Sequence, residues 1–293
     1  MTSVNTNTGA MTALMSLNST SSALASTEKK ISTGYKVADS TDDGAAYAVA
    51  QGVRSNVSVL TAVNNQLGNA TGLMSVTNSA LNSASTYMQT ISSDLTNIAA
   101  GTSNETANYV AKFNTDLKQL NNYLTGASYN NQSLINTTGG AAAATTATQT
   151  LTMDDHGTTQ PIGNYDVSSF VSSLQAVATN LATPPSGSTV QSVASGYVQG
   201  TGSIGTVGGL QKDISNLNSV ASQAGSDANF ITNQQTFNSA KMDALNTGLG
   251  ALVDADLAKE SANLTALQIK QQLGQQSLSI SNQAPSGLVS LFR

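Results

Sequence analysis

The side chains of this chain that could hold a metal or catalyse a reaction are few. The single histidine, His156, directly follows Asp154 and Asp155. A metal site there would have to be built mostly from carboxylates, because the chain has no cysteine and no second histidine. A solvated loop is the simpler interpretation of this cluster. We therefore expect no metal site and no cofactor.

A glycine-rich stretch resembles a nucleotide-binding motif in its letters only. Residues 200–205 read Gly-Thr-Gly-Ser-Ile-Gly, and Asp227 stands roughly where a ribose-binding acid would. The motif requires a buried apolar strand before it and a parallel sheet around it, whereas residues 192–199 are polar. We therefore predict a flexible linker here and expect that the protein is not an enzyme.

Three carboxylates, Asp39, Asp42 and Asp43, lie close together near the N-terminus. Their spacing is not that of a calcium-binding loop, which needs ligands at alternate positions. Two interpretations remain open at this point. The carboxylates cap a helix, or they make a contact between copies of the chain that involves Arg54.

The composition limits the class of partner. Charged residues make up 9% of the 293 residues, the net charge is -5, and the eleven Lys and Arg are scattered from Lys29 to Arg293. This argues against nucleic acid as a partner. No stretch reads as a cleavable secretory signal or as a membrane span, so we expect a protein that is soluble or exported by another route.

The polar surface must consist of Ser, Thr, Asn, Gln and Gly, which suits burial between copies, although a simply solvated helix surface would look the same.

Three long segments carry apolar residues at alternating steps of three and four, which predicts helices supercoiled around one another as an antiparallel coiled-coil rod. The first seam is Leu60, Val63, Leu67, Ala70, Met74, Thr77, Leu81, Ala84, Met88, Ile91, Leu95 and Ile98. The second is Val110, Phe113, Leu117, Leu120, Leu124 and Ala127. The third is Val207, Leu210, Ile214, Leu217, Ala221, Ala224, Ala228 and Ile231, then Gln235 and Asn238, then Met242, Leu245, Leu249 and Leu252.

Both ends of the chain also show helical spacing of apolar residues. The N-terminal stripe is Ala10, Leu14, Leu17, Leu24 and Ile31. Near the C-terminus one stripe is Leu257, Leu264, Leu267 and Leu278, and a second is Ala262, Ala266, Ile269, Leu273 and Ile280. A helix that is apolar on two sides must pack against more than one neighbour. We therefore expect both ends to seek partners, and to be disordered in the monomer until copies assemble.

Residues 139–205 lack this pattern and are expected to form a surface-exposed insertion. One short helix is predicted within it, with Val167, Phe170, Leu174, Val177 and Leu181 on one face and Pro184 as the stop. Residues 133–135 and 148–152 are expected to pair as a small hairpin.

The residues at both ends resemble those of bacterial flagellin, the filament subunit. At the start the similar stretches are Ser3-Val4-Asn5-Thr6-Asn7, Ile31-Ser32-Thr33-Gly34-Tyr35-Lys36-Val37 and Asp42-Asp43-Gly44-Ala45-Ala46. At the finish they are Asp254-Ala255-Asp256-Leu257-Ala258-Lys259-Glu260, Gln272-Leu273-Gly274-Gln275-Gln276-Ser277-Leu278 and Leu291-Phe292-Arg293. Tyr129-Asn130-Asn131-Gln132 resembles the family's turn into its hairpin. The resemblance covers about 1–138 and 206–293.

This resemblance implies a mainly α fold and three domains. Residues 1–36 with 255–293 would form a terminal-helix domain at the filament core, 37–138 with 206–254 the coiled-coil rod, and 139–205 a short variable insertion. The implied function is a structural subunit that self-assembles into the helical flagellar filament used for swimming. The implied partners are other copies of itself, the flagellar cap and hook-associated junction proteins, and an export chaperone that binds the C-terminal region. The implied location is extracellular, reached through the flagellar type III export apparatus.

The expected polymerisation interface follows from the stripes and the resemblance together. It comprises Leu14, Leu17, Leu24, Ile31, Asp43, Arg54, Leu257, Leu264, Leu267, Ile269, Leu273, Leu278, Ile280, Leu291 and Phe292. In many family members a host receptor reads the stretch equivalent to residues 87–98, here including Met88, Gln89 and Thr90. Thr90 stands where arginine is usual in the family, so we expect weak recognition.

Two alternatives share parts of this pattern. A flagellin-like protein that joins hook and filament would have the same terminal helices but would not form long polymers. A surface adhesin or ligand would instead use the insertion at 139–205.

Overall fold

The computed structural model describes residues 6–101, 103–138, 147–201 and 209–290. The chain divides into two compact units. One consists of residues 58–241, and the other of residues 1–57 together with 242–293. The two units are described separately below.

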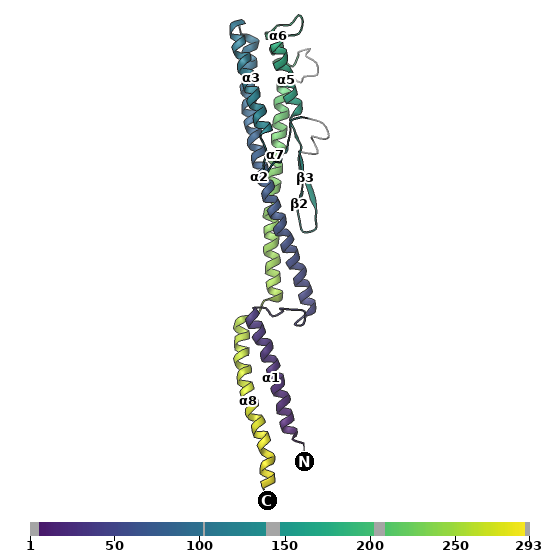
Figure 1. Cartoon of the computed structure of the whole chain (residues 1–293), viewed down its shortest axis with the longest axis vertical. Helices are drawn as coiled ribbons and strands as arrows, with labels where there is room; N and C mark the ends of the chain where they lie inside the picture. Colours follow the sequence, from purple (N-terminus) through teal and green to yellow (C-terminus); the bar gives the residue numbers. More distant parts are fainter. Residues whose placement is uncertain (1–5, 102, 139–146, 202–208, 291–293) are drawn as a thin grey trace. The chain divides into compact units, whose positions relative to one another are not determined.

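The 58–241 unit is a helical bundle built on three long helices, as the three seams predict. Within it run most of α2 (Gly44–Ala100), all of α3 (Ser103–Thr125) and most of α7 (Leu210–Val253) (Figure 1). Every residue of the first seam is buried, including Thr77, whose hydroxyl donates to the Leu73 carbonyl at 2.9 Å. In the second seam only Val110 is half-buried; the other residues are buried. The prediction of packed helices at these positions is confirmed.

The polar break in the third seam anchors a neighbouring strand pair. Asn238 is fully buried, and its side-chain amide donates to the Met153 carbonyl at 2.9 Å. Gln234 donates to the same carbonyl at 3.0 Å and to the Asn238 side-chain oxygen at 3.1 Å. A buried amide costs little when it is fully hydrogen-bonded, so the break in the apolar pattern serves as an attachment point. Val207, the first residue of this seam, lies outside the described residues.

The described residues contain four short strands, of which β1 lies just before the insertion, and their pairing corrects the predicted hairpin. β2 (Thr148–Thr152) pairs antiparallel with β3 (Thr159–Gly163), not with residues 133–135. β1 (Ile135–Asn136) instead pairs parallel with β4 (Tyr165–Asp166). The reason is the turn at 153–158, in which Asp154 accepts hydrogen bonds from the backbone amides of His156 and Thr158 at 3.0 and 2.9 Å. This turn closes β2 onto the strand that follows it.

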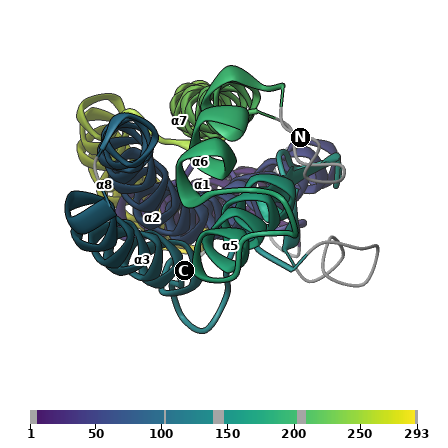
Figure 2. The same cartoon turned by 90° about the horizontal axis from the view of Figure 1, so that it is seen from above.

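In the part of the chain that the structure describes, two further helices pack on the bundle, and one of them was predicted. α5 (Ser168–Ala182) packs against α3, and all five residues of the predicted face are buried, with Val167 at the N-cap. α6 (Val190–Gln199) was missed, because it is short and its apolar residues are separated by Gln, Ser and Gly. It begins with a capping box in which Thr189 and Ser192 satisfy each other's backbone amides, and it buries Val193, Ala194 and Tyr197. Figure 2 shows α5 and α6 beside the long helices of the bundle.

The other unit contains α1 (Thr8–Thr33) and α8 (Leu257–Ser290), which run antiparallel along each other (Figure 1). Hydrogen bonds join the two helices near each end of the pair. Asn7 donates from its side-chain amide to the Ser281 carbonyl at 2.7 Å, and the Ala255 amide donates to the Gly34 carbonyl at 2.9 Å. Gly34 ends α1 in the left-handed conformation at φ +75°, a backbone geometry that favours glycine.

None of the described helices combines the length and apolar character that a membrane crossing requires.

Candidate functional site

The acidic cluster with the single histidine has a structural role in the hairpin turn. Metal-ligand atoms of Asp154, Asp155 and His156 lie within 4.8 Å of one another. Asp154 holds the turn itself, while Asp155 pairs with Lys241 of α7 at 2.5 Å. That hydrogen bond holds the pKa of the Asp155 carboxyl below its usual range, against the opposing effect of burial. His156 is exposed. Asp154 therefore holds the hairpin turn, and Asp155 fixes the hairpin to α7 of the bundle.

The context of the glycine-rich stretch is helical. Gly200 terminates α6 at φ +69°, so the motif follows a helix where a dinucleotide site needs a buried strand. Asp227, the candidate ribose-binding acid, accepts a hydrogen bond from the Tyr165 hydroxyl at 2.7 Å. Residues 202–205 of the motif lie outside the described residues.

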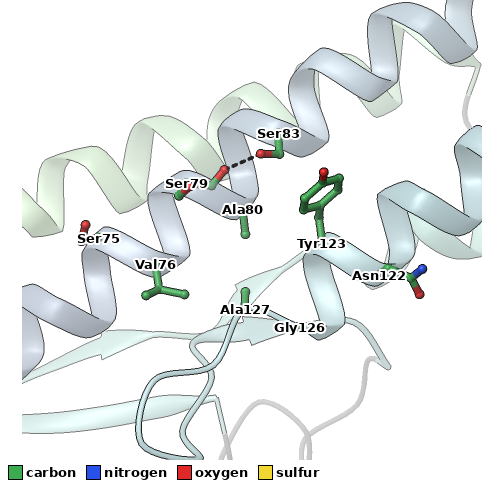
Figure 3. Close-up of a pocket in the computed structure, with 9 residues that line it drawn as sticks. All are labelled: Ser75, Val76, Ser79, Ala80, Ser83, Asn122, Tyr123, Gly126 and Ala127. Atoms are coloured by element: carbon green, nitrogen blue, oxygen red, sulfur yellow. Dashed lines mark hydrogen bonds between the residues drawn. The ribbon is translucent and has the colours of Figure 1, made fainter.

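A cavity of about 420 Å³ lies between α2 and the end of α3 (Figure 3). The ring of Tyr123 stands on one wall and small side chains of α2 on the other. Its nine lining residues include no histidine, lysine or carboxylate. The Ser83 hydroxyl donates to the Ser79 carbonyl of its own helix at 2.9 Å, so no base activates it. This cavity has no features of a catalytic site.

The α1–α8 pair has a packed seam between the two helices and further apolar residues that lie in solvent. The packed seam follows steps of three and four in both helices. Its buried and half-buried positions are Ala10, Ala13, Leu17, Thr20, Leu24, Thr27 and Ile31 in α1, and Leu264, Leu267, Gln271, Gly274, Leu278 and Ser281 in α8. Gly274 permits close approach, because a Cβ added there would lie 3.3 Å from Leu17 Cδ1. Six of the predicted interface residues (Leu17, Leu24, Ile31, Leu264, Leu267 and Leu278) lie in this seam.

Outside this seam both helices carry large apolar side chains in solvent, and we call these exposed positions together the open face. Leu273 is 59% exposed and Ile280 62% exposed, and Ile269, Leu257 and Leu14 are also exposed. All five were predicted as interface residues. Met11 and Met15 of α1 are also exposed and were missed. The signal in the sequence was that they lie four residues apart, with Leu14 between them. Leu291 and Phe292 lie outside the described residues.

The loop between α1 and α2 is held by a lysine that sequence analysis missed. Lys29 of α1 lies 2.6 Å from Asp39 and 2.8 Å from Asp42. Hydrogen bonds from Lys29 lower the pKa of both carboxyls, and the same bonds raise the pKa of Lys29. The Asp42 carboxylate also accepts from the backbone amides of Ala38 and Asp39 at 2.9 and 3.2 Å. We call these contacts of Lys29 with Asp39 and Asp42 the clasp; it holds the loop that follows α1.

The structure assigns helix capping to Asp43, one of the two interpretations left open above. Its carboxylate accepts from the amides of Ala45 and Ala46, both at 3.0 Å, at the start of α2. Arg54 lies over the Tyr35 ring at 5.7 Å from its centre and donates to the Gln51 side chain at 3.3 Å. Asp43 is exposed and Arg54 half-buried, so a contact of either with another copy stays a prediction.

The stretch expected to face a receptor is only partly at the surface. Met88 is 2% exposed and lies in the core of the bundle, since it belongs to the first seam. Its assignment to a receptor-facing surface is therefore corrected. Gln89 is exposed and Thr90 half-buried. Receptor recognition through these two residues stays a prediction.

Two buried tyrosines of the insertion hydrogen-bond carboxylates of α7. Tyr165 of β4 donates to Asp227, and Tyr197 of α6 donates to Asp213 at 2.5 Å. Burial raises the pKa of Asp213 to about 6, opposed by hydrogen bonds from Tyr197 and Ser173. Burial also raises the pKa of both phenols. The two pairs attach the insertion to the bundle at two levels of one helix.

Comparison with known proteins agrees with this arrangement. Residues 4–140 match the bacterial flagellin N-terminal helical region, and residues 207–292 match the bacterial flagellin C-terminal helical region. Flagellin FljK of Caulobacter vibrioides is 33% identical over 298 residues, covering 100% of this chain and 99% of the relative. A flagellin of Brucella melitensis is 28% identical, with all of both chains covered. Flagellin C of Rhizobium meliloti is 30% identical over 327 residues, again with all of both chains covered.

Proposed function

Since this chain belongs to the bacterial flagellin family and is a structural subunit of the flagellar filament, we propose that its copies assemble through the open face of the α1–α8 pair. The contact residues on this face are Met11, Leu14, Met15, Leu257, Ile269, Leu273 and Ile280. The seam residues act indirectly, because they hold the two helices in the register that presents this face.

The single observation that supports this proposal is the exposure of large apolar side chains on α1 and α8 outside the seam in which the two helices pack. Burying one such side chain completely is favourable by about 1.5–3 kcal/mol. Both helices carry such residues. A second copy that covers them would gain several such contributions at once, which is enough to offset the loss of freedom on association.

We further propose that α1 and α8 become stably ordered only on assembly. Isolated helices with many Ser, Thr and Asn residues are marginal in water, and packing along one seam covers only part of each helix. The division into a terminal-helix domain (1–36 with 255–293), a rod (37–138 with 206–254) and an insertion (139–205) stays part of this proposal.

The remaining partners belong to the same proposal. A subunit with exposed apolar C-terminal residues needs protection before assembly, which an export chaperone at the C-terminal region would provide. Export through the flagellar type III apparatus would bring the chain to the extracellular filament. Cap and hook-associated junction proteins would contact the open face at the ends of the filament, where no further copy covers it.

Seeded extension tests this proposal directly. Filament fragments are mixed with purified wild-type chain or with the triple variant Ile269→Ser, Leu273→Ser, Ile280→Ser. We expect the wild type to extend the fragments and the triple variant to fail. The matched control is Gln268→Ser, Gln272→Ser, Gln276→Ser, which makes three substitutions to the same residue at exposed positions of the same helix.

Two results would contradict the proposal. Extension by the triple variant at the wild-type rate would show that the open face is not the interface. Failure of the wild type to extend the seeds would favour the alternative of a hook-filament junction protein.

Receptor recognition is tested separately: we expect no response of a receptor reporter assay to nanomolar monomer, and a strong response would overturn that expectation.

A further inference from the structure

A second cavity, of about 570 Å³, lies in the 58–241 unit. It is bounded by α2, by the turn at 129–132 and by β2. Five of its seven lining residues carry side-chain amides, one is a tyrosine and one is the buried Leu73. The amide residues are Gln66, Asn69, Asn130, Gln132 and Gln149. None of the lining residues is charged.

The turn that forms one wall has a defined backbone geometry. Asn130 and Asn131 both have positive φ, 50° and 62°, as a two-residue hairpin turn of the primed type requires. Tyr129 and Gln132 exchange backbone hydrogen bonds at 2.9 and 3.0 Å across this turn. These bonds place the backbone of Tyr129, Asn130 and Gln132 at the cavity wall.

The ring of Tyr129 is fixed against α2 but remains accessible. A Cβ added at Gly72 would lie 3.2 Å from Tyr129 Cζ, so the ring rests directly on the glycine. The residue is nevertheless 42% exposed. An aromatic side chain held with part of its ring in solvent beside a polar cavity offers a flat apolar surface to a ligand.

The side-chain amides of the cavity wall can both donate and accept hydrogen bonds. Four of them, Gln66, Asn69, Asn130 and Gln132, each bring a donor group and an acceptor oxygen to the cavity. The fifth, Gln149, also lines the cavity, but its Oε1 has no accessible surface, so a ligand in the cavity does not reach that oxygen.

We propose that this cavity binds a neutral saccharide. A sugar ring has adjacent hydroxyls that donate and accept within a few ångströms, and it has an apolar C–H face. The amides match the hydroxyls, and the Tyr129 ring matches the apolar face. The lack of charge in the wall gives an anionic or cationic ligand no counter-ion, and the polar wall disfavours an apolar one. The cavity volume lies within the usual range for small-ligand sites.

Saturation-transfer NMR on the full-length monomer tests this site. The probes are three neutral trisaccharides (maltotriose, cellotriose and chitotriose), with sialyllactose as the charged comparison. We expect saturation transfer to the ring protons of at least one neutral probe, and at least a fivefold smaller signal from sialyllactose. Tyr129→Ala and Gln66→Leu are each expected to reduce the neutral signal at least fivefold.

Matched controls separate binding from general damage. Tyr123 is also 42% exposed but lines the other cavity, and Gln89 is exposed on α2, so Tyr123→Ala and Gln89→Leu should stay within twofold of wild type. Absence of transfer to every neutral probe overturns the inference, as does equal binding of sialyllactose or equal loss in the controls. A Tyr129→Ala variant that binds no less sugar but extends filaments poorly would assign the cavity to a second copy of the chain instead. This site does not depend on the assembly proposal, which the seeded extension tests separately.

Discussion

The bundle and the α1–α8 pair follow the same alternating spacing of apolar residues, yet they bury those residues to very different extents. In the bundle, Leu81 and the rest of the first seam are enclosed by several helices and strands. In the terminal pair, the seam positions are mostly half-buried and Leu273 is 59% exposed. A repeat of three and four specifies one contact seam per helix. How completely the helix is buried depends on how many neighbours it has, and in the terminal unit α1 and α8 pack along each other.

The largest expected effect contrasts the same substitution in the two regions. Leu81→Ala leaves a cavity in a closed core and should lower the free energy of unfolding by about 2–5 kcal/mol. Leu273→Ala in the monomer should change it by no more than about 0.5 kcal/mol, because that side chain is already in solvent. Urea unfolding of each monomer, followed by circular dichroism, measures both. Similar losses for the two variants would break the distinction between a closed core and an open face.

The second effect concerns Asp213, a titratable group that is buried in the bundle. Its pKa is raised in the folded state to about 6, so its contribution to stability is complete below about pH 4 and is lost as the pH rises through 6. Asp213→Asn removes this loss while its oxygen still accepts from Tyr197. The variant should therefore gain stability over wild type between pH 4.5 and 7.5, by at most about 3 kcal/mol. Urea unfolding at the two pH values tests this, and a difference independent of pH would refute it.

The third effect tests the polar anchor in the third seam. Asn238→Ala leaves the Met153 carbonyl with one donor fewer in a buried position, at an expected cost of about 1–3 kcal/mol. Asn233→Ala is the control, since Asn233 is exposed on the same helix. Thermal unfolding of both variants measures the difference. If both variants melt together, the break in the seam is not an attachment point for the hairpin.

The smallest effect is local and belongs to the terminal unit. Lys29→Met removes the clasp on Asp39 and Asp42, so the amides of residues 38–42 should exchange with solvent faster near neutral pH. The clasp is complete between the ordinary pKa values of its carboxyls and of its lysine. It weakens as the pH falls through the lowered carboxyl pKa values or rises through the raised lysine pKa. Lys30→Met is the neighbouring control. Unchanged exchange in the Lys29 variant would mean that the loop is held by its backbone bonds alone.

The sequence was sufficient for the elements whose evidence is periodic. The three long helices, the face of α5 and the presence of apolar residues on two sides of α8 all follow from spacing along one helix. The exposed apolar residues of α8 likewise appeared in the sequence as a second stripe. Which of the two stripes packs against α1 could not be decided from the spacing alone.

The sequence was insufficient where contacts join distant residues. The Tyr165–Asp227 and Tyr197–Asp213 pairs span 62 and 16 residues and leave no periodic signal. The strand pairing was wrong because strands of two to five residues are too short for alternation to select a partner, and the turn at Asp154 decided it. The amide cavity was equally hidden, because its walls come from three separate segments.

Amide hydrogen exchange on the monomer and on the assembled filament tests whether the terminal helices become ordered only when copies assemble. We expect slow exchange across α2, α3 and α7 residues of the 58–241 unit in both states, and fast exchange in α1 and α8 that becomes slow only in the filament. Strong protection of α1 and α8 already in the monomer, unchanged on assembly, would contradict it.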